Sequence, residues 1–141
     1  MRVERRDTGL RFGLARSSVE VTVCSARIVR VSVAEREGSN PEHAVSYVEP
    51  RAWSPPPIEI TEGPPARLAT SDLRLEVGTD PFGLIFTDAA GEWLLREPAD
   101  GGMAIERGAD GATRVRARFA FSGEQHFYGL GQGGGRLDRL G

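Results

Sequence analysis

The sequence predicts an all-β fold, an antiparallel β-sandwich, from three observations. Apolar and polar residues alternate in several short runs, as in strands with one buried face and one solvated face. Turn sequences such as Asp110-Gly111 separate these runs at short intervals, as antiparallel hairpins require. No segment carries apolar residues at positions i, i+3, i+4 and i+7 over three turns. Layers of short strands packed face to face are therefore expected.

Two valine-rich runs, residues 19–23 and 29–33, are the first strands predicted, because each places valines at alternate positions. Cys24 follows the first run and is the only cysteine, so an intramolecular disulfide and a cysteine-based zinc cluster are excluded. We expect Cys24 to be a small buried or half-buried apolar residue on a strand.

Residues 41–65 contain seven of the nine prolines, which excludes a long central strand there. An interdomain linker would leave 40 residues before it and 76 after it, a thin core for two domains. The sequence therefore favours a single domain, residues 1–141, with a proline-rich surface excursion. Trp53, Ile58 and Ile60 are the expected tethers of this excursion to the body.

The second half of the chain predicts one further strand and two hairpins. Leu73, Leu75 and Val77 alternate with charged residues, as in a half-buried strand. Residues 82–87 and 92–96 flank a turn that ends in Gly91.

The second hairpin joins a strand near residues 103–107 to a longer one at 113–121. In the longer strand, alternate apolar residues predict a buried face and the intervening arginines a solvated face. An anion-binding arginine stripe is the alternative. The apolar residues are Val115, Ala117, Phe119 and Phe121, and the arginines are Arg114, Arg116 and Arg118.

Composition disfavours several classes of function. The formal net charge is −2 and the acids are interspersed among the arginines, so nucleic acid is not an expected partner. No apolar run reaches eighteen residues and no signal peptide is recognisable, so we expect a cytoplasmic protein without a membrane span. His43 and His126 are the only histidines, and they lie far apart in sequence, so neither a metal site nor a cofactor is predicted.

The glycine-rich tail offers no assembled catalytic site. Residues 129–134 satisfy G-x-G-x-x-G, but only seven residues follow and no βαβ unit encloses them, which argues against a dinucleotide site. Glu124 and Asp138 flank the loop and are the one carboxyl pair considered for glycosidic acid/base chemistry. Capping and turn roles account for both, so no catalytic residue is predicted.

The tail resembles a known signature. Phe-Ala-Phe-Ser-Gly-Glu-Gln-His-Phe-Tyr-Gly-Leu-Gly-Gln at residues 119–132, with Leu-Asp-Arg-Leu-Gly at 137–141, is similar to the N-terminal domain of glycoside hydrolase family 31, the α-glucosidase and α-xylosidase family. Gln132 stands where the family usually has glutamate, and Leu140 where it often has a basic residue. The signature residues are Gly123, Glu124, Phe127, Tyr128, Gly129, Leu130 and Gly131.

The resemblance implies a galactose-mutarotase-like sandwich rather than a whole enzyme. In the family, the nucleophile and the acid/base are aspartates on a (β/α)8 barrel that follows this domain, and no residue here matches either one. Residues 123–141 would be a glycine-rich exit loop towards that barrel. The implied role is to pack on the barrel and lend loops to the binding of an α-glycoside, in an enzyme that retains anomeric configuration and needs no metal or cofactor. The segment would be inactive alone.

Two alternatives remain open. A free-standing carbohydrate-binding sandwich would use Trp53, Trp93 or Tyr128 as a stacking platform for a sugar ring. A sugar epimerase of the mutarotase type would need a histidine and a glutamate in a concave sheet, which two histidines scarcely allow.

Overall fold

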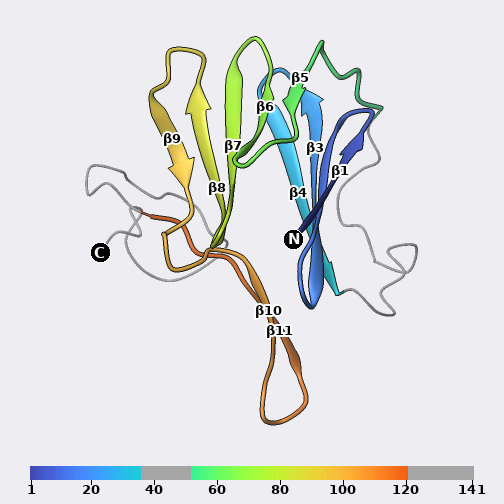
Figure 1. The fold of residues 1–141 in the computed structure, drawn as a ribbon, viewed down its shortest axis with the longest axis vertical. Coiled ribbons are helices and arrows are strands. Elements are labelled where there is room, and N and C mark those ends of the chain that lie inside the picture. Colours follow the sequence, from blue (N-terminus) through green and yellow to red (C-terminus); the bar gives the residue numbers. More distant parts are fainter. Residues whose placement is uncertain (36–51, 121–141) are drawn as a thin grey trace, which may run out of the picture.

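The computed structural model describes residues 1–35 and 52–120, and this part of the chain contains strands and no helix (Figure 1). The strands form a four-stranded sheet, a five-stranded sheet and a two-stranded hairpin, all antiparallel. The predicted all-β class is confirmed.

The first sheet is an antiparallel meander in the order β1-β2-β3-β4. Val19 pairs with both Phe12 and Val33, and Val21 pairs with Leu10, so apolar residues line up across the sheet on one face. The predicted alternation of the two valine-rich runs is confirmed. The bounds are β1 (Arg2–Arg6), β2 (Gly9–Gly13), β3 (Ser17–Ser25) and β4 (Ile28–Glu35).

The second sheet has the order β5-β6-β7-β8-β9. Leu75 pairs with both Leu68 and Phe86, and Val77 pairs with Leu84, which again gathers apolar residues on one face. An irregularity between Phe86 and Thr87 shifts the register with β9. The bounds are β5 (Glu59–Thr61), β6 (Ala66–Ala69), β7 (Leu73–Thr79), β8 (Phe82–Asp88) and β9 (Trp93–Arg96).

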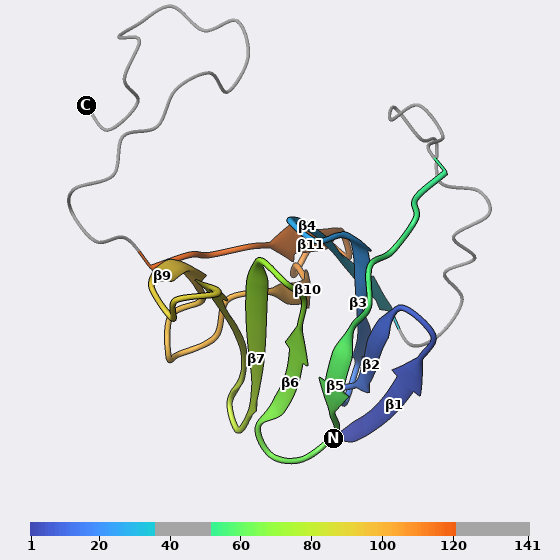
Figure 2. The ribbon, with the colours of Figure 1, turned by 90° about the horizontal axis from the view of Figure 1, so that it is seen from above.

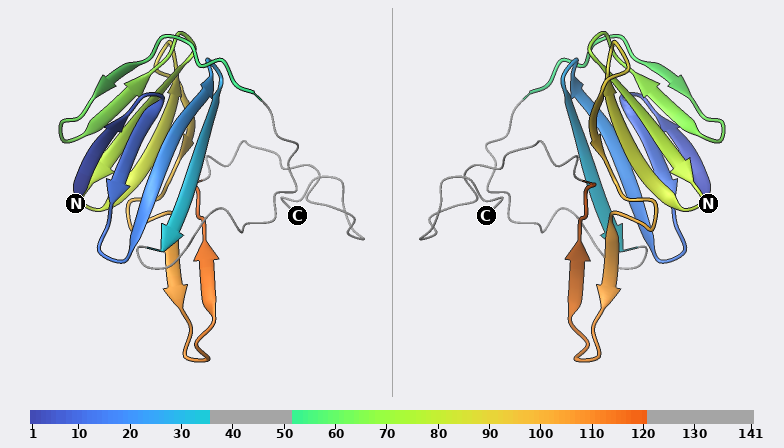
Figure 3. Two further views of the ribbon diagram at one scale, coloured as in Figure 1. Left: turned by 90° about the vertical axis from the view of Figure 1, so that its right-hand side faces the viewer. Right: turned by 90° about the vertical axis from the view of Figure 1, so that its left-hand side faces the viewer.

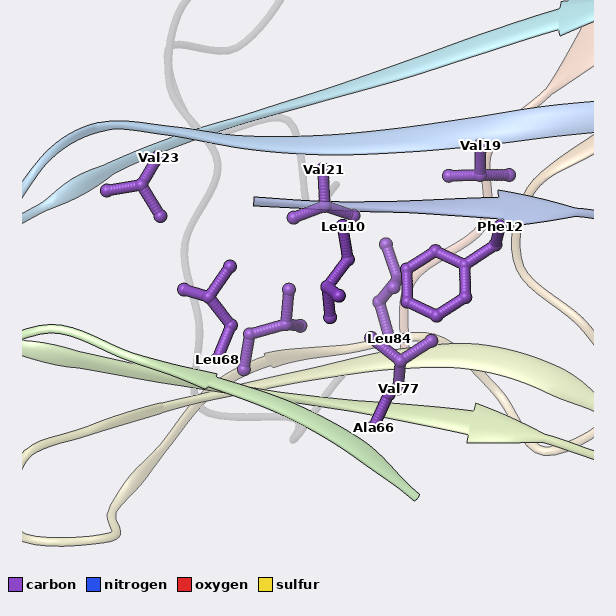
Figure 4. Packing of buried hydrophobic residues seen from close by; sticks show 10 residues of the cluster. Leu10, Phe12, Val19, Val21, Val23, Ala66, Leu68, Val77 and Leu84 are labelled. Atoms are coloured by element: carbon purple, nitrogen blue, oxygen red, sulfur yellow. The ribbon is translucent and has the colours of Figure 1, made fainter. Parts of the chain in front are cut away.

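The core lies between the two sheets, which face each other as the two layers of a sandwich (Figures 2 and 4). Phe12 and Phe82 meet across it edge to face, with ring centroids 5.6 Å apart. Cys24 is buried, as expected. The buried core residues are Leu10, Phe12, Val19, Val21, Val23, Ala66, Leu68, Leu75, Val77 and Leu84.

Turns at one end of the sandwich link the two sheets. Arg27, between β3 and β4, donates from Nε to Asp72 Oδ2 at 2.5 Å, and Asp72 lies between β6 and β7. The Thr70 hydroxyl donates to the carbonyl of Ala26 at 2.7 Å. The arginine lowers the pKa of Asp72 by hydrogen bonding to its carboxylate, helped by Ser71. These contacts align the corresponding turns of both layers.

The described part of the proline-rich stretch contributes an edge strand, β5. Ile58 and Ile60 pack against the core, as the tether hypothesis expects. Trp53 is 37% exposed. A short edge strand is the position that neighbouring prolines permit.

The hairpin of β10 (Ala104–Arg107) and β11 (Thr113–Arg116) extends beyond one end of the sandwich (Figures 1 and 3). The predicted turn is confirmed: Gly111 has φ +78°, the region that favours glycine.

The buried face predicted for the strand at 113–121 is wrong within the described residues. β11 ends at Arg116, all four of its residues are exposed, and Val115 is 71% exposed. The physical reason is position: the hairpin projects past both sheets, so no second layer covers it (Figure 3). The alternating pattern correctly predicts a strand. It does not predict whether another layer covers the apolar face of that strand.

Candidate functional site

The signature loop at residues 123–131, including Tyr128, lies outside the described residues, as do Phe121, Asp138 and both histidines. Its proposed contacts stay predictions. The sequence-predicted positions that the structure places are Trp53 and Trp93.

The two tryptophans lie on different elements. Trp53 belongs to the non-strand segment before β5 and presents part of its surface to solvent. Trp93 begins β9, and the guanidinium carbon of Arg96 lies 4.4 Å from the centroid of its ring. One face of Trp93 is therefore covered by a cation–π contact. A sugar ring could therefore stack only on the opposite face of the Trp93 ring, and this stacking role remains a prediction.

Glu97 is a buried acid that sequence reasoning missed; it is 6% exposed. It follows the last residue of β9, and its backbone N–H donates to the carbonyl of Leu84 at 2.9 Å. Its carboxylate Oε2 accepts the backbone N–H of Leu84 at 3.1 Å, so the two residues exchange hydrogen bonds. A side chain thus satisfies a backbone donor where the strand pairing ends.

Burial raises the pKa of the Glu97 carboxyl above its usual range, and the backbone groups of Leu84 and Met103 partly oppose this rise. Its Oε1 is buried and has no hydrogen-bond partner among the described residues. No second carboxyl contributes to the shift. The arrangement therefore fits a structural role, in which the Glu97 carboxylate holds the backbone of Leu84, rather than a role as one half of a catalytic carboxyl pair.

Gly102 is required by the packing of this carboxylate. A Cβ at residue 102 would lie 2.2 Å from Cδ of Glu97, well inside contact distance. The chain therefore passes directly over the Glu97 side chain on its way from β9 to β10. No local sequence pattern distinguishes this glycine from those in ordinary turns.

The three arginines of the predicted stripe each pair with a nearby acid. Arg114 contacts Asp110 at 2.6 Å, and Arg116 contacts Glu106 at 2.9 Å. Arg118 pairs with Asp100, and this hydrogen bond lowers the pKa of that carboxyl. This supports the solvated-face interpretation over the anion-binding stripe, because each arginine already has an anionic partner.

The rest of the described surface provides no metal centre. Within residues 1–35 and 52–120, no group of three histidine, cysteine, aspartate or glutamate side chains is placed to hold a metal ion. The same ranges contain no helix long and apolar enough to cross a membrane.

Comparison with protein families decides the relationship. Residues 18–141 match the model of the glycosyl hydrolase 31 N-terminal galactose mutarotase-like domain. The chain belongs to this family. No curated protein matches the chain.

The galactose mutarotase-like domain match begins within β3, yet the sandwich extends before it. Leu10 and Phe12 on β2 are fully buried in the common core. The strands β1 and β2 pair in register with β3 and complete the first sheet. The segment preceding the family match is therefore part of the same folded body.

Proposed function

We propose that this chain is the non-catalytic N-terminal β-sandwich of a retaining α-glycosidase, packing on a catalytic barrel and lending surface to its substrate-binding rim. The observation that carries the proposal is the match of residues 18–141 to the glycosyl hydrolase 31 N-terminal domain. The parent enzyme would hydrolyse α-glucosidic or α-xylosidic bonds.

The environments of three described acids, Glu97, Asp72 and Asp100, support a non-catalytic role. Retaining hydrolysis needs two carboxyl groups about 5–5.5 Å apart across the glycosidic bond. Glu97 is instead buried against backbone groups, and Asp72 and Asp100 are bound to arginines. These three carboxyl groups are accounted for by the fold.

Sequencing beyond the codon for Gly141 tests the proposal. We expect a (β/α)8 barrel with two catalytic aspartates in the same frame. The 141-residue chain should release no p-nitrophenol from p-nitrophenyl α-glucoside or α-xyloside above the buffer rate, whereas the polypeptide that includes the barrel should. Hydrolysis by the 141-residue chain, or the lack of a barrel in this and the neighbouring frame, would contradict the proposal.

A free-standing carbohydrate-binding module is the second candidate, favoured by the exposure of Trp53. Tryptophan fluorescence titrated with maltose, glucose and xylose oligomers distinguishes the two. A saturable change at millimolar sugar that Trp53→Ala abolishes, and Trp93→Ala retains, would favour the module. The absence of any change in the unsubstituted chain would reject it.

A further inference from the structure

The segment that joins β9 to the projecting hairpin closes over the Glu97 carboxyl. This segment, residues 98–103, follows Glu97 and leads into β10. A Cβ at Gly102 would lie 2.2, 2.3 and 2.5 Å from Cδ, Cγ and Cβ of Glu97, so the backbone of the segment rests directly on this side chain. Glu97 is 6% exposed in this arrangement. Full access of water to the carboxyl therefore requires a neighbouring part of the chain to move away.

The hydrogen bonding of this carboxyl is incomplete. Oε2 accepts the N–H of Leu84 on β8 at 3.1 Å, whereas Oε1 is buried and has no partner among the described residues. An ionised oxygen without a partner is costly away from water. The closed arrangement therefore favours the protonated, uncharged carboxyl, and burial raises its pKa accordingly.

The charged side chains on the elements around Glu97 do not offset this cost. None of them contributes to the shift of its pKa, which burial raises and only backbone groups oppose. Burial, rather than a neighbouring charge, therefore decides the protonation state of Glu97. The charged groups that flank the segment are already engaged: Arg96 lies over the Trp93 ring, Arg118 pairs with Asp100, Arg116 pairs with Glu106, and Asp88 accepts the N–H of Glu92.

Segment 98–103 lies outside the sheets, so it can move at less cost than the strand on the other side of Glu97. That strand, β8, is paired with both β7 and β9. The segment instead contains a turn, in which the N–H of Gly101 donates to the carbonyl of Pro98 at 3.0 Å. Local openings involve the least hydrogen-bonded parts of a structure first. The segment is therefore the part that opens when the carboxyl is exposed to water.

The same segment holds the base of the hairpin. It continues directly into β10, and beyond β11 the N–H of Arg118 donates to the carbonyl of Gly102 at 3.1 Å. The guanidinium of Arg118 also pairs with Asp100. Both strands of the hairpin are therefore attached to the segment, and opening the segment loosens the hairpin against the sandwich.

We propose that segment 98–103 is a pH-sensitive latch, closed over Glu97 when this residue is protonated and favouring an open arrangement when the proton is lost. In the open arrangement the carboxylate reaches water and the base of the hairpin is released. The latch is a property of the described fold and is independent of any glycosidase activity.

The direction of the pH dependence follows from the two environments of Glu97. In the open arrangement its pKa returns towards the ordinary value of about 4.3, whereas burial raises the pKa in the closed arrangement. The equilibrium constant for opening is therefore constant below about pH 4 and rises by at most about tenfold per pH unit above it. It becomes constant again above the pKa of the closed arrangement.

Hydrogen exchange in the unsubstituted 141-residue chain measures this opening. Leu84 and Val23 are both 1% exposed; the Leu84 N–H is bound to the Glu97 carboxyl, and the Val23 N–H is bound to the carbonyl of Thr8 at 2.7 Å in the other sheet. After correction for the chemical exchange rate, the opening constant of Leu84 should rise with pH and should not respond to low urea, because a local opening exposes little surface. That of Val23 should rise with urea, because its exposure requires unfolding of the first sheet.

Glu97→Gln is the matched variant, because it keeps an acceptor for the Leu84 N–H and removes the titration. In this variant the opening constant of Leu84 should be independent of pH. A pH-independent opening constant in the unsubstituted chain would overturn the proposal, and so would a rise that persists in Glu97→Gln. Exchange of Leu84 that follows urea as steeply as that of Val23 would also overturn it, because Glu97 would then meet water only on global unfolding.

Thiol labelling reports on the segment itself. Met103 ends the segment and packs against the core, and Ile85, 40% exposed on β8, is the control position. Each is replaced by cysteine together with Cys24→Ala, which removes the native thiol. With each rate corrected for the measured pKa of its thiol, labelling of Met103→Cys relative to Ile85→Cys should rise with pH, and Glu97→Gln should abolish the rise. A ratio that stays constant in the chain with Glu97 would mean that the segment remains closed and would overturn the proposal.

Discussion

Replacing Glu97 by glutamine should remove one component of the pH dependence of folding. Burial raises the pKa of this carboxyl in the folded protein above its unfolded value of about 4.3. The folded state then binds the proton more tightly than the unfolded state. The contribution of this carboxyl to the free energy of unfolding is therefore fully present below about pH 4, where the group is protonated in both states. This contribution is lost as the pH rises through the folded-state pKa.

The magnitude follows from the geometry. Each pH unit by which the folded pKa exceeds the unfolded pKa corresponds to about 1.4 kcal/mol of stability lost at high pH. Glutamine carries no charge to desolvate, and its side-chain oxygen can still accept the Leu84 N–H. Glu97→Ala removes that acceptor, and leaving a buried donor unpaired costs about 1–3 kcal/mol.

Urea unfolding followed by circular dichroism between pH 4 and pH 8 measures both effects. We expect the stability of Glu97→Gln relative to the unsubstituted protein to increase with pH, because only the unsubstituted protein pays for burying the charge. The titrations of Asp72 and Asp100 are common to both proteins and cancel in this difference. A difference that is constant or decreases with pH would refute the reasoning.

Three further substitutions are expected to change stability in the same assay. Phe12→Ala should cost about 3–5 kcal/mol because Phe12 is fully buried in the core; a loss below 1 kcal/mol would mean that β2 is not part of the core. Gly102→Ala should destabilise by about 1–3 kcal/mol through collision with Cβ, Cγ and Cδ of Glu97, and in the Glu97→Gly background, which removes all three atoms, most of this loss should vanish. Val77→Ala should cost at least about 1.5 kcal/mol, whereas Val115→Ala, exposed on the hairpin, should change stability by less than about 0.5 kcal/mol; equal losses would contradict the exposed position of Val115.

Most of the sandwich was predictable from alternation and turn chemistry. The valines of residues 19–23 and 29–33 lie on the core face because strand side chains alternate and only one face is covered. The β1–β2 hairpin was not predicted. Arg5, Arg6 and Asp7 surround its turn, and its strands carry few apolar residues. Leu10 and Phe12 nevertheless become core because β2 pairs with the valine strand.

The candidate site was less predictable, because the burial of its residues depends on how distant parts of the chain pack together. The sequence around Glu97 resembles the end of an ordinary surface hairpin, and only the return of the chain over Gly102 buries its carboxylate. The family signature, in contrast, was recognisable from the residue order of the tail, and the family match covers it.

The exposed apolar side chains of β9 and of the projecting hairpin have the same physical cause, which is an apolar strand face that no other layer covers. Alternation in residues 113–121 encodes an apolar face, and Val115 and Phe119 present that face to solvent in the described structure. A face of this kind costs solubility unless another layer covers it. At Val115 the side chain stays exposed because only the base of the hairpin reaches the sandwich, where the Thr113 hydroxyl donates to Glu35 Oε1 at 3.3 Å.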